Sequence, residues 1–204
     1  MGMAFVLSLA ISYLIGSISF SYLIAKRMAG IDIRAHGSGN AGATNTLRVL
    51  GKGPAILVLF LDALKGLAAM GISYLITDGN LTAYALAGIF AIAGHNWPVF
   101  FGFRGGKGIA TTLGVAIGFS PLSFLVCTLI TVAVIAVTRY VSLGSLVFVT
   151  ALPICLFLLE DAIIFAEVSL ILAIFAYVRH YTNILNLLAG KERKLGERSQ
   201  RDLK

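Results

Sequence analysis

Long stretches without any charged residue constrain this chain more than any other feature. Residues 1–25 contain none, and a second uncharged stretch runs from residue 108 to residue 138. A helix needs about 20 apolar residues to cross a hydrocarbon core of about 30 Å. Only 12% of the 204 residues are charged, against about 25% in soluble globular domains. We therefore expect an all-α integral membrane protein, and this length favours a single domain.

Charged and turn residues divide the sequence into seven expected transmembrane segments. Ser120 and Pro121 interrupt the second uncharged stretch, and proline is tolerated at a helix start, so that stretch is divided in two. Its first half would be only about 16 Å long as a helix, so we expect a half-span or one arm of a re-entrant hairpin. The segments are expected at 1–25, 54–77, 81–93, 109–119, 121–138, 141–159 and 162–177.

Basic residues lie in alternate loops of this arrangement. The loops after the second, fourth and sixth segments contain no basic residue, whereas the other loops are basic. The positive-inside rule makes the basic side cytoplasmic, and five full spans would give the same sidedness. The first segment lacks the basic start of a signal peptide, so we expect it to stay, with its amino end outside. We expect one transmembrane catalytic domain, 1–190, and a basic cytoplasmic tail, 191–204, that is solvated and attracted to anionic lipid.

The first cytoplasmic loop has the residue types of an anion site. Gly37 and Gly39 permit a tight turn, Ser38 or Asn40 can cap a following helix, and helix N-termini bind anions. Arg48 offers a two-pronged fork for phosphate. A continuous helix would separate Ser38 from Arg48 by about 15 Å, so both can serve one phosphate only if the early part is loop. A short interfacial helix after an ordinary glycine turn is the alternative.

The second cytoplasmic loop ends in Gly105, Gly106, Lys107 and Gly108 and leads into the short 109–119 helix. Consecutive glycines allow close approach of an anion, and lysine and the helix dipole add positive charge. The pattern lacks the Ser or Thr that follows lysine in a Walker A loop. A basic turn at the membrane edge explains it equally well.

A third polar cluster follows the last expected span. His180 and Asn183 are three residues apart and share a helical face. The histidine can orient a substrate or move a proton, although a surface histidine at a helix C-terminus is the alternative. Arg139 and Ser142 form a smaller polar site one loop earlier.

Within the membrane segments, Asp62 and Lys65 are placed to pair at i, i+3. Buried charges of this kind are costly, so they are functional or structural by default. The sequence contains no nucleophile elbow, no metal-binding His-Glu-x-x-His motif and no carboxylate cluster. We expect neither a metal nor another cofactor.

Taken together, these segments resemble the bacterial membrane family of acyl-phosphate:glycerol-3-phosphate acyltransferases. The resemblance rests on Gly-Ser-Gly-Asn-x-Gly-Ala-Thr-Asn at 37–45, Gly-His at 94–95 with Phe-x-Gly-Gly-Lys-Gly at 103–108, and His-x-x-Asn at 180–183. It extends to Asp62, Lys65, Arg139 and Ser142 and covers nearly the whole chain. Ser19, Ser21 and Arg104 depart from the family pattern, where proline, glycine and lysine are usual.

The resemblance implies transfer of a fatty acyl group from acyl phosphate to the 1-hydroxyl of glycerol 3-phosphate, at the cytoplasmic face of a bacterial inner membrane. It implies catalytic roles for His180, Asn183, Ser38 and Arg48. Phosphate binding is expected from Gly39, Asn40, Asn45, Arg104, Gly105, Gly106, Lys107, Gly108, Arg139 and Ser142. Supporting roles are expected for Asp62, Lys65, His95 and Glu192.

The net charge of +7, from 16 basic and nine acidic residues, suits such anionic substrates and anionic lipid. Aromatic residues are not interleaved with the basic ones, which argues against nucleic acid, and no obligate protein partner is indicated. A small transporter of an anionic solute would also combine apolar helices with intramembrane charges, but its polar residues would lie near the midplane. A membrane scaffold would leave the glycine loops without a role.

Overall fold

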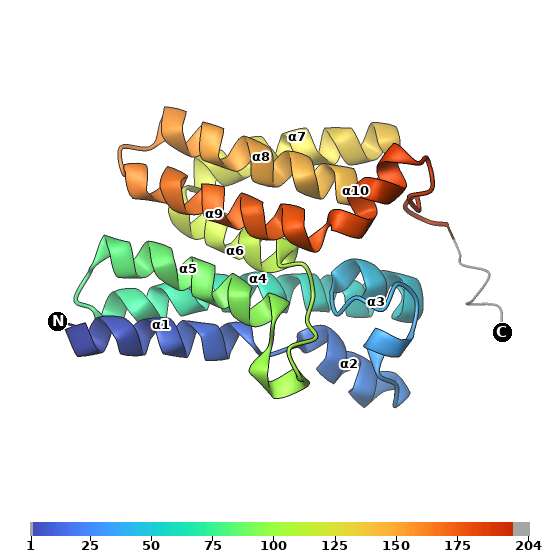
Figure 1. The fold of residues 1–204 in the computed structure, drawn as a ribbon, viewed down its shortest axis with the longest axis horizontal. Coiled ribbons are helices and arrows are strands. Elements are labelled where there is room, and N and C mark those ends of the chain that lie inside the picture. The colour runs from blue at the N-terminus through green and yellow to red at the C-terminus, as the bar shows by residue number, and fades with distance from the viewer. Residues whose placement is uncertain (1, 198–204) are drawn as a thin grey trace. The chain divides into compact units, whose positions relative to one another are not determined.

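The computed structural model describes residues 2–197, and every regular element within that range is helical, which confirms the expected all-helical fold (Figure 1). Residues 198–204 of the predicted tail lie outside the described residues. Two short 3-10 turns are η1 (Ile33–Ala35) and η2 (Val99–Phe101). The helices are α1 (Gly2–Gly16), α2 (Phe20–Ala29), α3 (Ala43–Leu50), α4 (Lys52–Ile76), α5 (Leu81–Asn96), α6 (Ile109–Phe119), α7 (Pro121–Thr138), α8 (Val141–Leu159), α9 (Ile163–Arg179) and α10 (Tyr181–Leu188).

Helices occupy all seven expected ranges, but they differ in length. Four segments are long and apolar enough to cross a membrane: α1 with α2, then α4, α7 and α8. A fifth is obtained if α9 and α10, which meet at 64°, count as one broken span. The 11 residues of α6 are too few for a full crossing, as its sequence predicts.

The first expected segment is interrupted rather than continuous. α1 ends at Gly16, where a side chain would collide with the carbonyl of Ala91 on α5, and α2 begins only at Phe20. The carbonyl of Ile18, in the break, accepts a hydrogen bond of 2.6 Å from the buried Lys65 ammonium group. The break therefore provides a buried cation with a partner that a continuous helix would have used internally.

The described residues fall into two compact units, 2–115 and 116–197. In the first unit α1, α4 and α5 pack side by side (Figure 1), and α3 packs on α4. A small core of Ala25, Ile33 and Ala41 joins α2 to the polar loop that follows it. Serines 8, 12 and 73 are buried and hydrogen-bonded between α1 and α4. The interior of this unit is thus rich in small and polar side chains.

The second unit contains α7, α8 and α9, with α10 contacting both α8 and α9. Ser120 caps α7 by accepting a hydrogen bond from the Ser123 N–H, and Pro121 occupies the first helical turn, as its position in the sequence indicates. Arg139 ends α7 in the left-handed conformation, with φ at 64°. This turn brings the predicted Arg139 and Ser142 to one end of the α7–α8 pair.

Large apolar side chains are exposed along the long helices of both units. Leu75 is 77% exposed and Val137 is 85% exposed, and many leucines and phenylalanines are also exposed. A water-soluble protein rarely exposes continuous apolar surface of this extent. The outward-facing leucines with a small, polar interior are the arrangement that a lipid solvent favours.

Candidate active site

The first glycine turn is held in place by one buried side chain. Asn45, on α3, accepts a hydrogen bond from the Ser38 N–H at 2.8 Å. Its amide group donates to the carbonyls of Ile33 and His36 at 3.1 and 3.0 Å. Gly37 has φ at 62°, and a side chain there would collide with the Asn45 amide oxygen. Asn45 therefore sets the conformation of the turn that presents the exposed Ser38.

The expectation that Ser38 or Asn40 caps the following helix is wrong. α3 begins at Ala43 with Gly42 at the cap position, and no side chain caps it. In this loop a side chain caps η1 and not α3: the Asp32 carboxylate accepts a hydrogen bond from the Arg34 N–H. Ser38 is therefore in a loop, which removes the 15 Å separation that a continuous helix would impose.

A second pair of residues fastens this loop to the next one. The Arg34 guanidinium makes a two-pronged ion pair with Asp32 at 2.8 and 2.9 Å and donates to the carbonyl of Phe101 at 2.7 Å. The hydrogen bond from Arg34 lowers the pKa of Asp32 below its ordinary value. The Arg34 guanidinium also lies over the ring of Tyr22. No residue pattern marks this link, because Phe101 is 67 residues away and contributes only its backbone.

The second glycine loop folds directly onto the end of α5. The Gly106 N–H donates to the carbonyl of His95 at 3.1 Å. A side chain at Gly105 would collide with that same carbonyl, and one at Gly106 would collide with the His95 ring and the carbonyl of Ala41. Close packing therefore requires these glycines even without a ligand. The contact with Ala41 also brings the two glycine loops together within the first unit.

Beneath this loop lies the intramembrane ion pair, as the i, i+3 spacing predicts. The Lys65 ammonium is 2.7 Å from the Asp62 carboxylate, and both side chains are buried. It lies 3.1 Å from Nδ1 of His95, on α5. A lysine has no acceptor, so Nδ1 accepts and the neutral ring carries its hydrogen on Nε2, which faces Gly106. The Asp62–Lys65 ion pair on α4 is thus connected through the His95 side chain on α5 to the second glycine loop.

Sequence reasoning missed Asn96, the last residue of α5. Its side chain is fully buried, and within residues 2–197 neither amide atom has a hydrogen-bond partner. The amide lies against Gly108, which has φ at 82° and precedes the first residue of α6. Lys107 is half-buried between the two glycines, whereas Arg104 is exposed. An unpaired amide beside a helix N-terminus is unusual in a protein interior.

In the second unit, His180 lies at the bend between α9 and α10. It is buried, so the alternative of a surface histidine is wrong. Its Nδ1 lies 2.8 Å from the carbonyl of Ala176 and donates to it, which makes Nε2 the acceptor atom of the neutral ring. One turn later the Asn183 amide donates to the Glu192 carboxylate at 2.7 Å. Glu192 thereby supports Asn183.

Arg139 and Ser142 lie together at the α7–α8 turn. Arg139 is exposed, and its guanidinium donates to the carbonyl of Leu195 at 2.8 Å. Ser142 is buried on the first turn of α8, and its hydroxyl has no hydrogen-bond partner among the described residues. The second unit therefore holds two groups of predicted residues, one on this turn and one at the α9–α10 bend.

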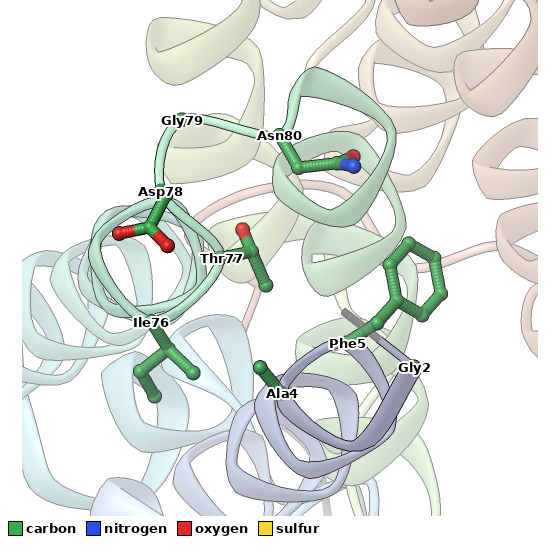
Figure 2. Close-up of a pocket in the computed structure, with 8 residues that line it drawn as sticks. All are labelled: Gly2, Ala4, Phe5, Ile76, Thr77, Asp78, Gly79 and Asn80. Carbon is green, nitrogen blue, oxygen red and sulfur yellow. The ribbon is translucent and has the colours of Figure 1, made fainter.

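A cavity of about 470 Å³ lies elsewhere in the first unit. Figure 2 shows that its polar groups, from Thr77, Asp78 and Asn80, come from the α4–α5 turn, whereas α1 contributes Gly2, Ala4 and Phe5. This turn is at the opposite end of α5 from the glycine loop, and no residue singled out from the sequence lines the cavity.

Comparison with known proteins decides which family this arrangement represents. The profile of a family described as glycerol-3-phosphate acyltransferase matches residues 6–190. The chain belongs to this family. Among its relatives, the glycerol-3-phosphate acyltransferase of Halalkalibacterium halodurans is 51% identical over 93% of this chain and 94% of its own. That of Shouchella clausii is 49% identical over 91% of this chain and 93% of its own.

Solved acyltransferase structures share the fold as well. The crystal structure of an integral membrane glycerol 3-phosphate acyltransferase in its glycerol 3-phosphate form has a TM-score of 0.88, with 37% identity over 94% of this chain and 96% of that one. Its lysophosphatidic acid form has a TM-score of 0.86 at the same identity, over 94% of this chain and 95% of that one. The expected family and the expected integral membrane fold are both confirmed.

Proposed function

We propose that the protein transfers a fatty acyl group from acyl phosphate to the 1-hydroxyl of glycerol 3-phosphate, releasing lysophosphatidic acid and inorganic phosphate. The observation that carries this proposal is the match, over 94% of the chain, to one acyltransferase in glycerol 3-phosphate and lysophosphatidic acid forms. These two ligands are the acceptor and the product of that reaction. The relatives' names specify the acceptor, and the acyl phosphate donor is our proposal.

An acyl phosphate suits the groups available at the two glycine loops. It is a mixed anhydride that is already activated for attack, so the protein has mainly to position two anions and stabilise charge. Arginine, lysine, serine and backbone N–H groups perform those tasks without a covalent intermediate. The hydroxyl of glycerol 3-phosphate attacks the acyl carbon, the carbon–oxygen bond to phosphate breaks, and phosphate leaves with the electron pair.

We assign the substrate phosphates to Ser38, Arg48, Lys107 and the N-terminus of α6, with Arg139 and Ser142 as further ligands. The contact between the glycine loops at Ala41 and Gly106 supports a shared role for the first four groups. Hydrogen bonds to charged groups contribute about 1.5–3 kcal/mol each. Lys107→Ala should therefore raise a Michaelis constant at least about tenfold. Unchanged constants for both substrates would remove Lys107 from the site. We keep Gly39, Asn40, Gly105 and Gly108 as parts of the loops and assign Asn45 to support.

His180 and Asn183 are assigned to the acceptor substrate. In the neutral ring, Nε2 of His180 can accept the hydroxyl proton, and the Asn183 amide can orient that hydroxyl. We favour positioning over general-base catalysis, because a phosphate leaving group needs little help from a strong base. An oxygen of the donor phosphate can then take the proton.

The donor experiment compares palmitoyl phosphate with palmitoyl-coenzyme A, using purified protein in lipid nanodiscs and radioactive glycerol 3-phosphate. We expect lysophosphatidic acid from the acyl phosphate alone, with stoichiometric release of phosphate. Product from the thioester at a comparable rate would overturn the assigned donor. A mock preparation from cells that lack the protein is the control for contaminating activity.

We place the reaction at the cytoplasmic face of the bacterial inner membrane, because both glycine loops and the Arg139 turn are basic. A reporter fused after Lys204 should therefore be active only in the cytoplasm. A periplasmic signal would reverse this topology without affecting the donor assignment.

A further inference from the structure

The chain does not leave the second unit when α10 ends. Residues Lys191–Glu197, which we call the C-terminal strap, return to the α7–α8 turn. The Leu195 N–H donates to the carbonyl of Arg139 at 2.7 Å, and the Arg139 guanidinium donates to the carbonyl of Leu195 at 2.8 Å. Two reciprocal hydrogen bonds to one residue define a specific docking position.

The other end of the strap is fastened to α10. The N–H groups of Lys191 and Glu192 both donate to the carbonyl of Asn186, at 2.7 and 3.1 Å. The Glu192 carboxylate accepts from the Asn183 amide, and the Lys194 ammonium lies 5.6 Å from the centre of the Tyr140 ring. All these partners belong to the second unit. Seven residues thus link the α9–α10 bend to the α7–α8 turn.

We propose that the C-terminal strap is a positioning element of the active site, which fixes Asn183 and Arg139 for acyl transfer. This inference rests on the proposed function. The bond to Glu192 determines which amide atom of Asn183 faces the strap, so the opposite atom, Oδ1, is presented away from it. The bonds to Leu195 restrict an exposed arginine whose side chain would otherwise lose much rotamer entropy on binding a phosphate.

The competing account is electrostatic. A basic tail beyond the last span can attract anionic lipid, at about 1 kcal/mol per charge near the surface. That account depends on the number of charges and not on the backbone of Leu195 or on the carboxylate of Glu192. Variants that change the charge of the tail but keep these contacts, or the reverse, therefore separate the two accounts.

The first experiment compares two shortened proteins, one ending at Gly190 and the other at Glu197. The longer protein keeps the whole strap and should match the full-length protein in both kinetic constants. The shorter one should lose about 100-fold in kcat/KM, since small misplacements of positioning groups cost this much. Equal constants within about twofold for the two proteins would overturn the proposal.

Point variants assign the two ends of the strap separately. Glu192→Ala should lower kcat at least about tenfold, whereas Glu192→Gln, which keeps an amide oxygen as acceptor, should recover most of it. Leu195→Pro removes the N–H that bonds to Arg139 and should mainly raise a Michaelis constant. The double variant Lys191→Gln with Arg193→Gln should leave both constants unchanged. Loss of activity in that double variant alone would favour the lipid account and overturn ours.

Docking of the strap can also be measured without substrate. The Leu195 amide should exchange its hydrogen slowly in the full-length protein, and trypsin should cleave after Arg193 slowly in native nanodiscs. Fast exchange together with fast cleavage would overturn the strap whether or not acyl phosphate is the donor. Slow exchange in a protein without acyl-phosphate activity would instead reject the proposed donor and keep the docked segment.

Discussion

Replacing Asn45 with aspartate distinguishes a residue that shapes the first glycine turn from one that binds phosphate. The two side chains have nearly the same shape, and the aspartate can still accept the hydrogen bond from the Ser38 N–H. It cannot donate to the carbonyls of Ile33 and His36, which Asn45 contacts at 3.1 and 3.0 Å. The variant thus removes two of three hydrogen bonds and places an oxygen against two carbonyl oxygens.

The expected magnitude follows from those two bonds. A net contribution of about 0.5–1.5 kcal/mol each gives a loss of about 1–3 kcal/mol in the local stability of the turn. Opening of the turn should then become about 5- to 150-fold more frequent. Unsatisfied carbonyls in this buried site would increase the loss, since Asn45 is only 1% exposed. Poor positioning of Ser38 should lower kcat/KM in proportion to the fraction of molecules whose turn is open.

Hydrogen exchange of the Ser38 amide, measured without substrate, tests this reasoning. The Asn45→Asp protein should exchange faster by the factor above. Asn80→Asp is the matched control. Asn80 caps the start of α5, at the opposite end of that helix from the second glycine loop, and the aspartate can still accept from the Ala83 N–H. Reduced activity with unchanged Ser38 exchange would show that Asn45 acts on the phosphate directly, which would refute the positioning role.

Other substitutions test the remaining contacts. His180→Gln should retain turnover within a few fold, as judged by initial rates, because the donor phosphate can take the proton; a loss of about 100-fold or more would make the histidine the general base. Gly106→Ala should reduce kcat/KM at least about tenfold, since its methyl group would collide with the histidine ring beneath the loop, whereas Gly53→Ala, with open space around it, should not. Lys65→Met alone should destabilise the protein by about 3–5 kcal/mol in a detergent unfolding titration, and adding Asp62→Leu should restore most of that loss, because the uncompensated buried carboxylate is then removed.

The steric requirement at the second loop changes how its glycines are interpreted. From the sequence, Gly105 and Gly106 indicate close approach of an anion. In the structure the loop packs against the last turn of α5, where the same glycines avoid collision with a carbonyl and a histidine ring. Both requirements can hold at once. The pattern alone therefore predicts the place of the site better than the reason for each glycine.

Local chemistry was enough to predict several features of this protein. Uncharged stretches predict membrane helices because a lipid solvent excludes charge, and the Asp62–Lys65 pair follows from the i, i+3 spacing of a helix. The helix start at Pro121 follows from the missing N–H of proline. Each of these predictions depends on residues that are near one another in the chain.

Only the tertiary structure decided the contacts between distant segments. Arg34 binds the backbone of Phe101, Lys65 binds the carbonyl of Ile18 in the break after α1, and Leu195 binds the backbone of Arg139. Every residue has a backbone carbonyl, and every residue except proline has a backbone N–H. The sequence therefore contains no signal that marks which backbone group makes a given contact. Such contacts are selected by how the helices pack and where they end. For that reason the sequence determined the membrane fold and the residue types of the site, whereas packing determined which groups hold those residues in place.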